Sequence, residues 1–86
     1  MTIFEYLRAK YGDKGARILT AMEARAFGIE FPLKAGWVDQ HGATQIHPTV
    51  ARRLAERLQL KAERSGDAKK ARSCRLGATI LKGVAK

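Results

Sequence analysis

The sequence contains a single cysteine, two prolines, few aromatic residues and no long apolar run. Because Cys74 is its only cysteine, the chain cannot form an intramolecular disulfide, which argues against a secreted, cross-linked scaffold and favours a reducing cytoplasm. No stretch approaches the roughly 18 apolar residues of a membrane span, and the first ten residues carry charges where a signal peptide needs an apolar stretch. We therefore expect a cytoplasmic protein that does not cross a membrane.

Acidic residues are also scarce, with eight Asp and Glu against 17 Lys and Arg, which leaves a net charge of +9 on 86 residues. The excess is uneven. Residues 1–47 hold six basic and five acidic residues, whereas residues 48–86 hold eleven basic and three acidic ones, a net charge of +8. So many like charges repel one another in the folded state, and such an excess usually functions in binding a polyanionic partner. We therefore expect nucleic acid to bind the second half of the chain.

Apolar residues make up 45% of the chain, which is enough for one modest core. Capping-box patterns and apolar residues at helical spacing predict an all-α fold of four to five short helices. The expected helices are 2–11, 21–27, 48–64 and 68–82, and a glycine-containing loop is expected from Gly12 to about Arg17. We expect residues 1–64 to form a helical core domain and residues 65–86 to form a basic C-terminal helix or a partly ordered tail.

Residues 32–46 allow two interpretations. Pro32 suits the first turn of a helix, so a helix from Pro32 to about Val38 or Gln40 is one of them. The other is a small β-hairpin, or wing, over residues 37–46, because two short apolar runs flank Gln40-His41-Gly42. The sequence does not decide between helix and hairpin.

The segment Thr20 to Val38, TAMEARAFGIEFPLKAGWV, resembles the helix-turn-helix family, and more distantly the opening helices of excisionase-like and MerR-like DNA-binding domains. Ala24 and Gly28 match the family's small residue four positions before the turn glycine. Ile29 and Trp37 supply apolar residues after the turn, although Pro32 and Gly36 both fall inside the supposed recognition helix. The resemblance implies a DNA-binding segment over residues 20–38, with Lys34 as a contributor to base recognition. The alternative is an ordinary helical hairpin whose apolar residues form the hydrophobic core.

Basic residues crowd the exposed sides of the two C-terminal helices, where phosphate contacts would give tight and salt-sensitive binding. A solvated charged surface is the alternative, but few acidic residues balance these charges. With Lys34, the candidate nucleic-acid-binding residues are Arg52, Arg53, Arg57, Lys61, Lys69, Lys70, Arg72 and Arg75. Lys69 and Lys70 stand at a helix N-terminus, where positive charge opposes the helix dipole and an anionic partner would relieve the cost.

Catalysis, cofactor binding and metal binding have little support. His41, His47 and Cys74 lack a fourth zinc ligand at a suitable spacing. Cys74 is better explained as a small buried apolar residue than as a nucleophile. The aromatic residues Phe27, Phe31 and Trp37 could stack on single-stranded bases, but near a turn in a small domain they more often form core.

We therefore expect a non-enzymatic DNA-binding protein with no cofactor, a transcription regulator or an accessory factor of a mobile element, that prefers duplex DNA over RNA. The alternatives are an RNA-binding or ribosome-associated protein and a module that binds an acidic protein. Binding to a membrane surface is disfavoured, because the last helix has a mostly alanine apolar face and no aromatic anchor. Val50, Leu54 and Leu58 would supply a homodimer interface, unless the monomer core needs them.

Overall fold

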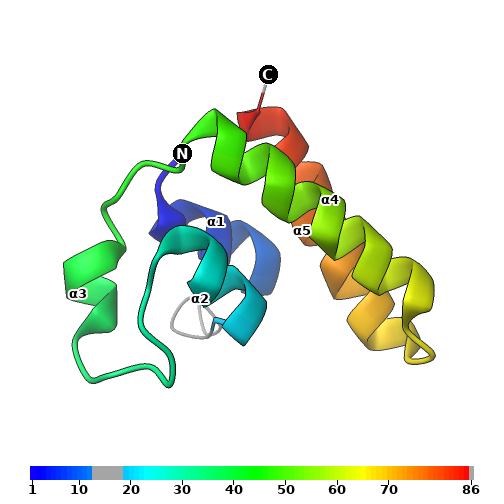
Figure 1. Cartoon of the computed structure of the whole chain (residues 1–86), viewed down its shortest axis with the longest axis horizontal. Helices are drawn as coiled ribbons and strands as arrows, with labels where there is room; N and C mark the ends of the chain where they lie inside the picture. Colours follow the sequence, from blue (N-terminus) through cyan, green and yellow to red (C-terminus); the bar gives the residue numbers. More distant parts are fainter. Residues whose placement is uncertain (13–18, 86) are drawn as a thin grey trace. The chain divides into compact units, whose positions relative to one another are not determined.

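The computed structural model describes residues 1–12 and 19–85, so the loop predicted from Gly12 to Arg17 lies almost wholly outside the described residues. Five helices follow one another along the chain, and no strand occurs in the described ranges, which confirms the all-α prediction (Figure 1). The chain divides into two compact units, residues 1–46 and residues 47–86. Each unit is described by itself.

In the first unit, helix α1 (Ile3–Tyr11) and helix α2 (Ala21–Phe27) both begin with the predicted capping box. The Thr2 hydroxyl accepts a hydrogen bond from the Glu5 backbone N–H, and the Glu5 carboxylate accepts one from the Thr2 N–H. Thr20 and Glu23 repeat this exchange at α2. The two boxes satisfy backbone donors that a helix start leaves without partners, which is why the helices begin at these residues.

Helix α2 ends as predicted at Gly28, which adopts the left-handed conformation with φ at +75° and donates to Ala24 and Arg25. The Ile29 N–H also bonds the Ala24 carbonyl, and Ile29 is buried. The helix expected to start at Pro32 is wrong, because the next helix, α3, covers only Trp37–His41. Gly36 immediately before it has φ at +82°, which an α-helix cannot include, so Pro32 lies in the preceding loop.

The alternative interpretation of residues 37–46 as a β-hairpin is wrong as well, because its first half is helix α3. Its second half is extended but pairs with the beginning of the chain. The Ile3 N–H bonds the Thr44 carbonyl at 3.0 Å, the Ile46 N–H bonds the Met1 carbonyl at 2.9 Å, and Thr2 and Gln45 form an isolated antiparallel bridge. Residues 44–46 thus hold the start of α1 in place.

A buried ionic network joins α1 to α2 around the carboxylate of Glu23, which is fully buried. The Lys10 ammonium donates to Glu23 Oε2 at 3.0 Å, and the Tyr6 hydroxyl donates to the same oxygen. The Tyr11 hydroxyl donates to Oε1 at 2.8 Å. The Lys10 side chain is only 2% exposed, although lysine is rarely buried unless it is paired.

The Glu23 network makes the first unit sensitive to acid. Burial alone would raise the pKa of Glu23, but the Lys10 charge and the hydrogen bonds from Tyr6, Lys10 and Thr20 outweigh it and hold the pKa below its ordinary value. The unfolded chain therefore binds a proton more readily than the folded one. The resulting stabilisation is fully present above the unfolded pKa of about 4.3 and is lost as pH falls through the lower folded pKa.

We expect urea midpoints followed by Trp37 fluorescence to be nearly constant from neutral pH to about pH 5 and to fall below that. Trp37 is the only tryptophan and is buried, so it reports on the first unit. Glu5 adds to the same decline, because its pKa is also lowered. The largest cause is the hydrogen bond from the Thr2 backbone N–H. A Glu23→Gln variant with an equally steep decline would contradict the assignment to Glu23.

In the second unit, helix α4 (Pro48–Arg64) begins with Pro48 at its first position, as predicted. His47 is the N-cap, and its Nδ1 accepts a hydrogen bond from the Thr49 backbone N–H at 3.1 Å. The buried residues of α4 recur at spacings of one, three and four, which places them along one side of the helix: Ala51, Leu54, Ala55, Leu58 and Ala62.

Helix α5 (Ala68–Val84) follows after only three residues and runs antiparallel along α4 (Figure 1). Small side chains at its buried positions allow close packing of the two helices, and Cys74 is one of them. Residues 68–84 thus form a regular helix. The sequence suggested a core domain ending at residue 64. The division between the units falls instead between Ile46 and His47, because α4 packs with α5 into one helical hairpin.

Candidate nucleic-acid interface

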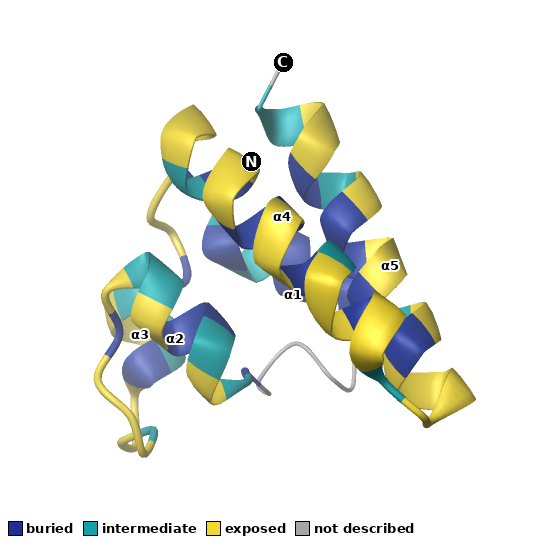
Figure 2. Ribbon diagram, turned by 45° about the vertical axis from the view of Figure 1, so that its right-hand side comes forward, coloured by how far each residue is buried: buried dark blue, intermediate teal, exposed yellow. Residues whose placement is uncertain are grey.

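The helical period of α4 gathers four basic residues on one exposed side. They stand at spacings of four, four and three, so they fall within about 80° of arc around the helix. This basic stripe consists of Arg53, Arg57, Lys61 and Arg64. All four residues are exposed, and Figure 2 shows exposed residues along one side of α4. No acidic residue falls within the arc of the stripe. Among the described residues, none of the four forms an ion pair.

The basic stripe runs from Arg53 to Arg64, eleven residues further on, a length of about 16 Å along the helix. Arg64 was not among the predicted site residues, because the helix was expected to end near it. The signal for including it was present in the spacing, since position 64 follows Arg53 by eleven residues, close to three whole turns. Three of the predicted residues and one missed residue therefore form a row of unpaired positive charge.

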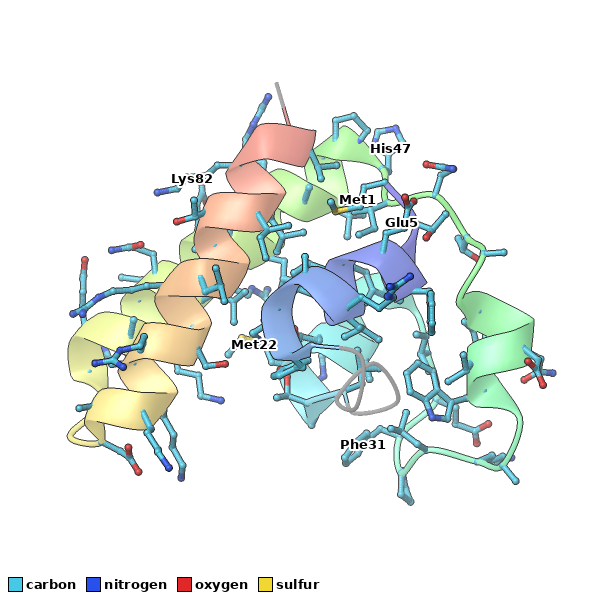
Figure 3. All side chains as sticks on the ribbon, turned by 180° about the vertical axis from the view of Figure 1, so that it is seen from behind. Met1, Glu5, Met22, Phe31, His47 and Lys82 are labelled. Atoms are coloured by element: carbon cyan, nitrogen blue, oxygen red, sulfur yellow. The ribbon has the colours of Figure 1, made fainter. Side chains whose placement is uncertain are left out.

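A second surface of the same hairpin has mixed charge. Two hollows mark it, one of about 290 Å³ lined by Arg52, Glu56 and Lys82 among others, and one of about 460 Å³ lined by Glu63, Arg72 and Arg75 among others. Figure 3 labels Lys82, near the C-terminal end of α5. We call this surface the mixed face, and its charged members are Arg52, Glu56, Glu63, Arg72, Arg75 and Lys82. The helical fold thus separates Arg52, Arg72 and Arg75 from the basic stripe.

Lys69 and Lys70 lie exposed in the first turn of α5, where an anion was expected to offset their effect on the helix dipole. The chain supplies that anion itself. Asp67 is the N-cap, and its carboxylate accepts hydrogen bonds from the backbone N–H groups of Lys69 at 2.9 Å and Lys70 at 3.3 Å. Ser65 in turn accepts a hydrogen bond from the Asp67 N–H. This helix start is therefore capped without an external ligand.

Lys34 belongs to the other unit and lies in the loop between α2 and α3. Its ammonium pairs with Glu30 at 3.0 Å, and both side chains are 72% exposed. Nine residues, 28–36, separate α2 from α3, whereas the turn of a helix-turn-helix has three or four. Membership in the helix-turn-helix family stays a prediction from the residue pattern, and the nine-residue loop between α2 and α3 does not support it.

The three aromatic residues weighed as a stacking platform lie in different environments. Trp37 is buried, and Phe27 packs edge-on against Tyr6 with ring centroids 5.8 Å apart. Phe31 is exposed in the loop before α3 (Figure 3). Two of the three aromatic residues therefore serve packing within the first unit.

Cys74 is buried, as expected for a small apolar residue. Within residues 1–12 and 19–85, no three or more His, Cys, Asp and Glu side chains are grouped so that they could hold a metal ion. The buried polar groups of the Glu23 network donate to or accept from one another, and among the described residues no buried side-chain nitrogen or oxygen atom lacks a hydrogen-bond partner. The leucines proposed for a dimer interface, Leu54 and Leu58, are buried in the single chain, which favours the core interpretation.

No protein-family model matches the chain, and comparisons with curated proteins and with solved structures find no match. Of the helices that the structure describes, none is both long and apolar enough to cross a membrane.

Proposed function

We propose that this protein binds nucleic acid, duplex DNA in preference to RNA, and that it acts by binding alone as a cytoplasmic regulator or accessory factor. The observation that carries the proposal is the basic stripe, in which four exposed basic residues share one side of α4 with no ion-pair partner among the described residues. A row of unpaired cations on a rigid helix favours a polyanion, because each phosphate it neutralises releases condensed counterions.

The proposed phosphate contacts are three of the predicted residues and Arg64, which was not predicted. Arg53, Arg57, Lys61 and Arg64 form the principal contact surface. The basic residues of the mixed face stand beside Glu56 and Glu63, which would repel phosphates, so they contribute mainly to the long-range field.

The test is fluorescence anisotropy of labelled random duplex DNA, single-stranded DNA and hairpin RNA, each titrated with the protein at several salt concentrations. We expect duplex DNA to bind most tightly. The logarithm of its affinity should fall linearly with the logarithm of salt concentration, with a slope of about −3.6 if the four stripe residues each neutralise one phosphate.

Two outcomes would overturn the proposal. Tighter binding to hairpin RNA than to duplex DNA would reject the preference for DNA and favour the RNA-binding alternative. Absence of binding to all three nucleic acids at low salt would reject nucleic-acid binding altogether. In that case an acidic protein would be the better candidate partner.

A further inference from the structure

Leu60 is an exposed apolar residue at the edge of the basic stripe, on the side opposite Lys61. Its side chain is 51% exposed, although most leucines of the hairpin are buried. It stands three residues after Arg57 and four before Arg64, so helical geometry places Leu60, Arg53, Arg57 and Arg64 within roughly 60° of arc. The leucine therefore faces whatever the three arginines bind.

This arc is directed away from α5. By the helical period its centre lies roughly 145° from the mean direction of the buried residues of α4, which are Ala51, Leu54, Ala55, Leu58 and Ala62. Because α4 and α5 pack against each other, the arc is on the free outer side of the hairpin. A helix can enter a groove only if its contacting side is free in this way, and an α-helix with side chains is about 10–12 Å wide, close to the roughly 12 Å major groove of B-DNA.

Other nucleic-acid shapes fit less well. The minor groove of B-DNA is only about 6 Å wide, and the major groove of an RNA helix is deep and narrow. Recognition of single strands depends on aromatic stacking, and residues 47–86 contain no Phe, Tyr or Trp. Beside a major groove, an exposed leucine has one natural partner, the C5-methyl group of thymine.

We propose that α4 enters the major groove of duplex DNA and that Leu60 contacts thymine methyl groups there, while Arg53, Arg57 and Arg64 bind phosphates or base edges around it. Lys61, on the flank next to Arg57, meets the nearer phosphate strand. Glu56 and Glu63 occupy the opposite flank and are repelled by phosphates, so α4 lies closer to the strand on the Lys61 side. This inference rests on the proposed function and adds the groove, the recognised group and a sequence preference.

The experiment compares a duplex of alternating deoxyadenosine and thymidine with the same duplex in which deoxyuridine replaces every thymidine. This replacement removes only the methyl groups. We expect the protein to bind the thymidine duplex about fourfold more tightly for each methyl group that Leu60 buries, from about 0.8 kcal/mol per buried methyl. In the Leu60→Ala variant the two duplexes should bind equally, with the salt slope unchanged.

The matched control is Leu76→Ala on α5, since Leu76 is 44% exposed and lies outside the stripe. This variant should keep the preference for thymidine. Equal binding of both duplexes by the unmodified protein, with the expected salt slope, would overturn the major-groove inference and leave the proposed function standing. No binding to either duplex at low salt would overturn both. Circular dichroism should show equal helicity in both variants, because both leucines are exposed.

Discussion

Replacement of Glu23 by Gln is expected to destabilise the first unit by about 3–5 kcal/mol. Glutamine keeps the shape of the side chain but removes the charge, so the ammonium of Lys10, 2% exposed, is left buried without a counter-charge. The hydroxyls of Tyr6 and Tyr11 also lose a charged acceptor. Small domains are stable by only about 5–15 kcal/mol, so this loss removes a large part of the total.

The measurement is urea unfolding followed by Trp37 fluorescence. Glu30→Gln is the matched control, since it removes the same charge from an exposed pair with Lys34, four residues further along the loop. Such a pair contributes less than about 1 kcal/mol. The double variant Lys10→Met, Glu23→Gln keeps the test measurable if Glu23→Gln leaves too little folded protein. It should regain stability, because it leaves no buried charge unpaired. Equal losses for Glu23→Gln and Glu30→Gln would show that the buried pair has no special role.

Neutralising the whole basic stripe is expected to lower affinity for duplex DNA by roughly three to four orders of magnitude at 0.1 M salt. The variant replaces Arg53, Arg57, Lys61 and Arg64 with Gln. If each residue neutralises one phosphate, the slope of log affinity against log salt concentration becomes shallower by about 3.6. Because 0.1 M is one log unit below 1 M, where the electrostatic contribution vanishes, the affinity at 0.1 M falls by about 3.6 log units. Glutamine is a good helix former, so α4 should persist.

The mixed face provides a control in which the same number of charges is removed. Replacing the four basic residues of the mixed face, Arg52, Arg72, Arg75 and Lys82, with Gln also lowers the net charge from +9 to +5. This variant loses the same long-range attraction but no principal phosphate contact, so its affinity should fall by less than about tenfold. Similar losses in both variants would mean that total charge, rather than its arrangement on α4, governs binding.

Much of the helical framework follows from local chemistry. Thr2 with Glu5 and Thr20 with Glu23 specify two helix starts, because the residues that exchange hydrogen bonds are three apart in sequence. Gly28 and Pro48 likewise act within one turn. The region around Pro32 was predicted less well, since a proline suits a helix start and also a loop, and the φ of Gly36 decided against the helix.

The candidate site was predicted in composition but not in arrangement. Counting charges located the basic half of the chain, and Arg53, Arg57 and Lys61 were named correctly as exposed on α4. Whether Arg72 and Arg75 join the stripe depends on which sides of α4 and α5 face each other. Both arginines line a hollow together with Glu63, so they lie apart from the stripe. Lys69 and Lys70 were expected to need an anion, and Asp67 meets that need.

Features set by neighbours within about four residues were therefore readable from the sequence: the capped helix starts, the end of α2, the helical periodicity of α4 and α5 and the excess of positive charge. Features that join distant residues were not. Burial of Lys10 against Glu23 and pairing of Thr2 with Gln45 connect residues 13 and 43 positions apart. Such contacts form because burial and backbone pairing favour them once the chain has folded, and no local pattern encodes them.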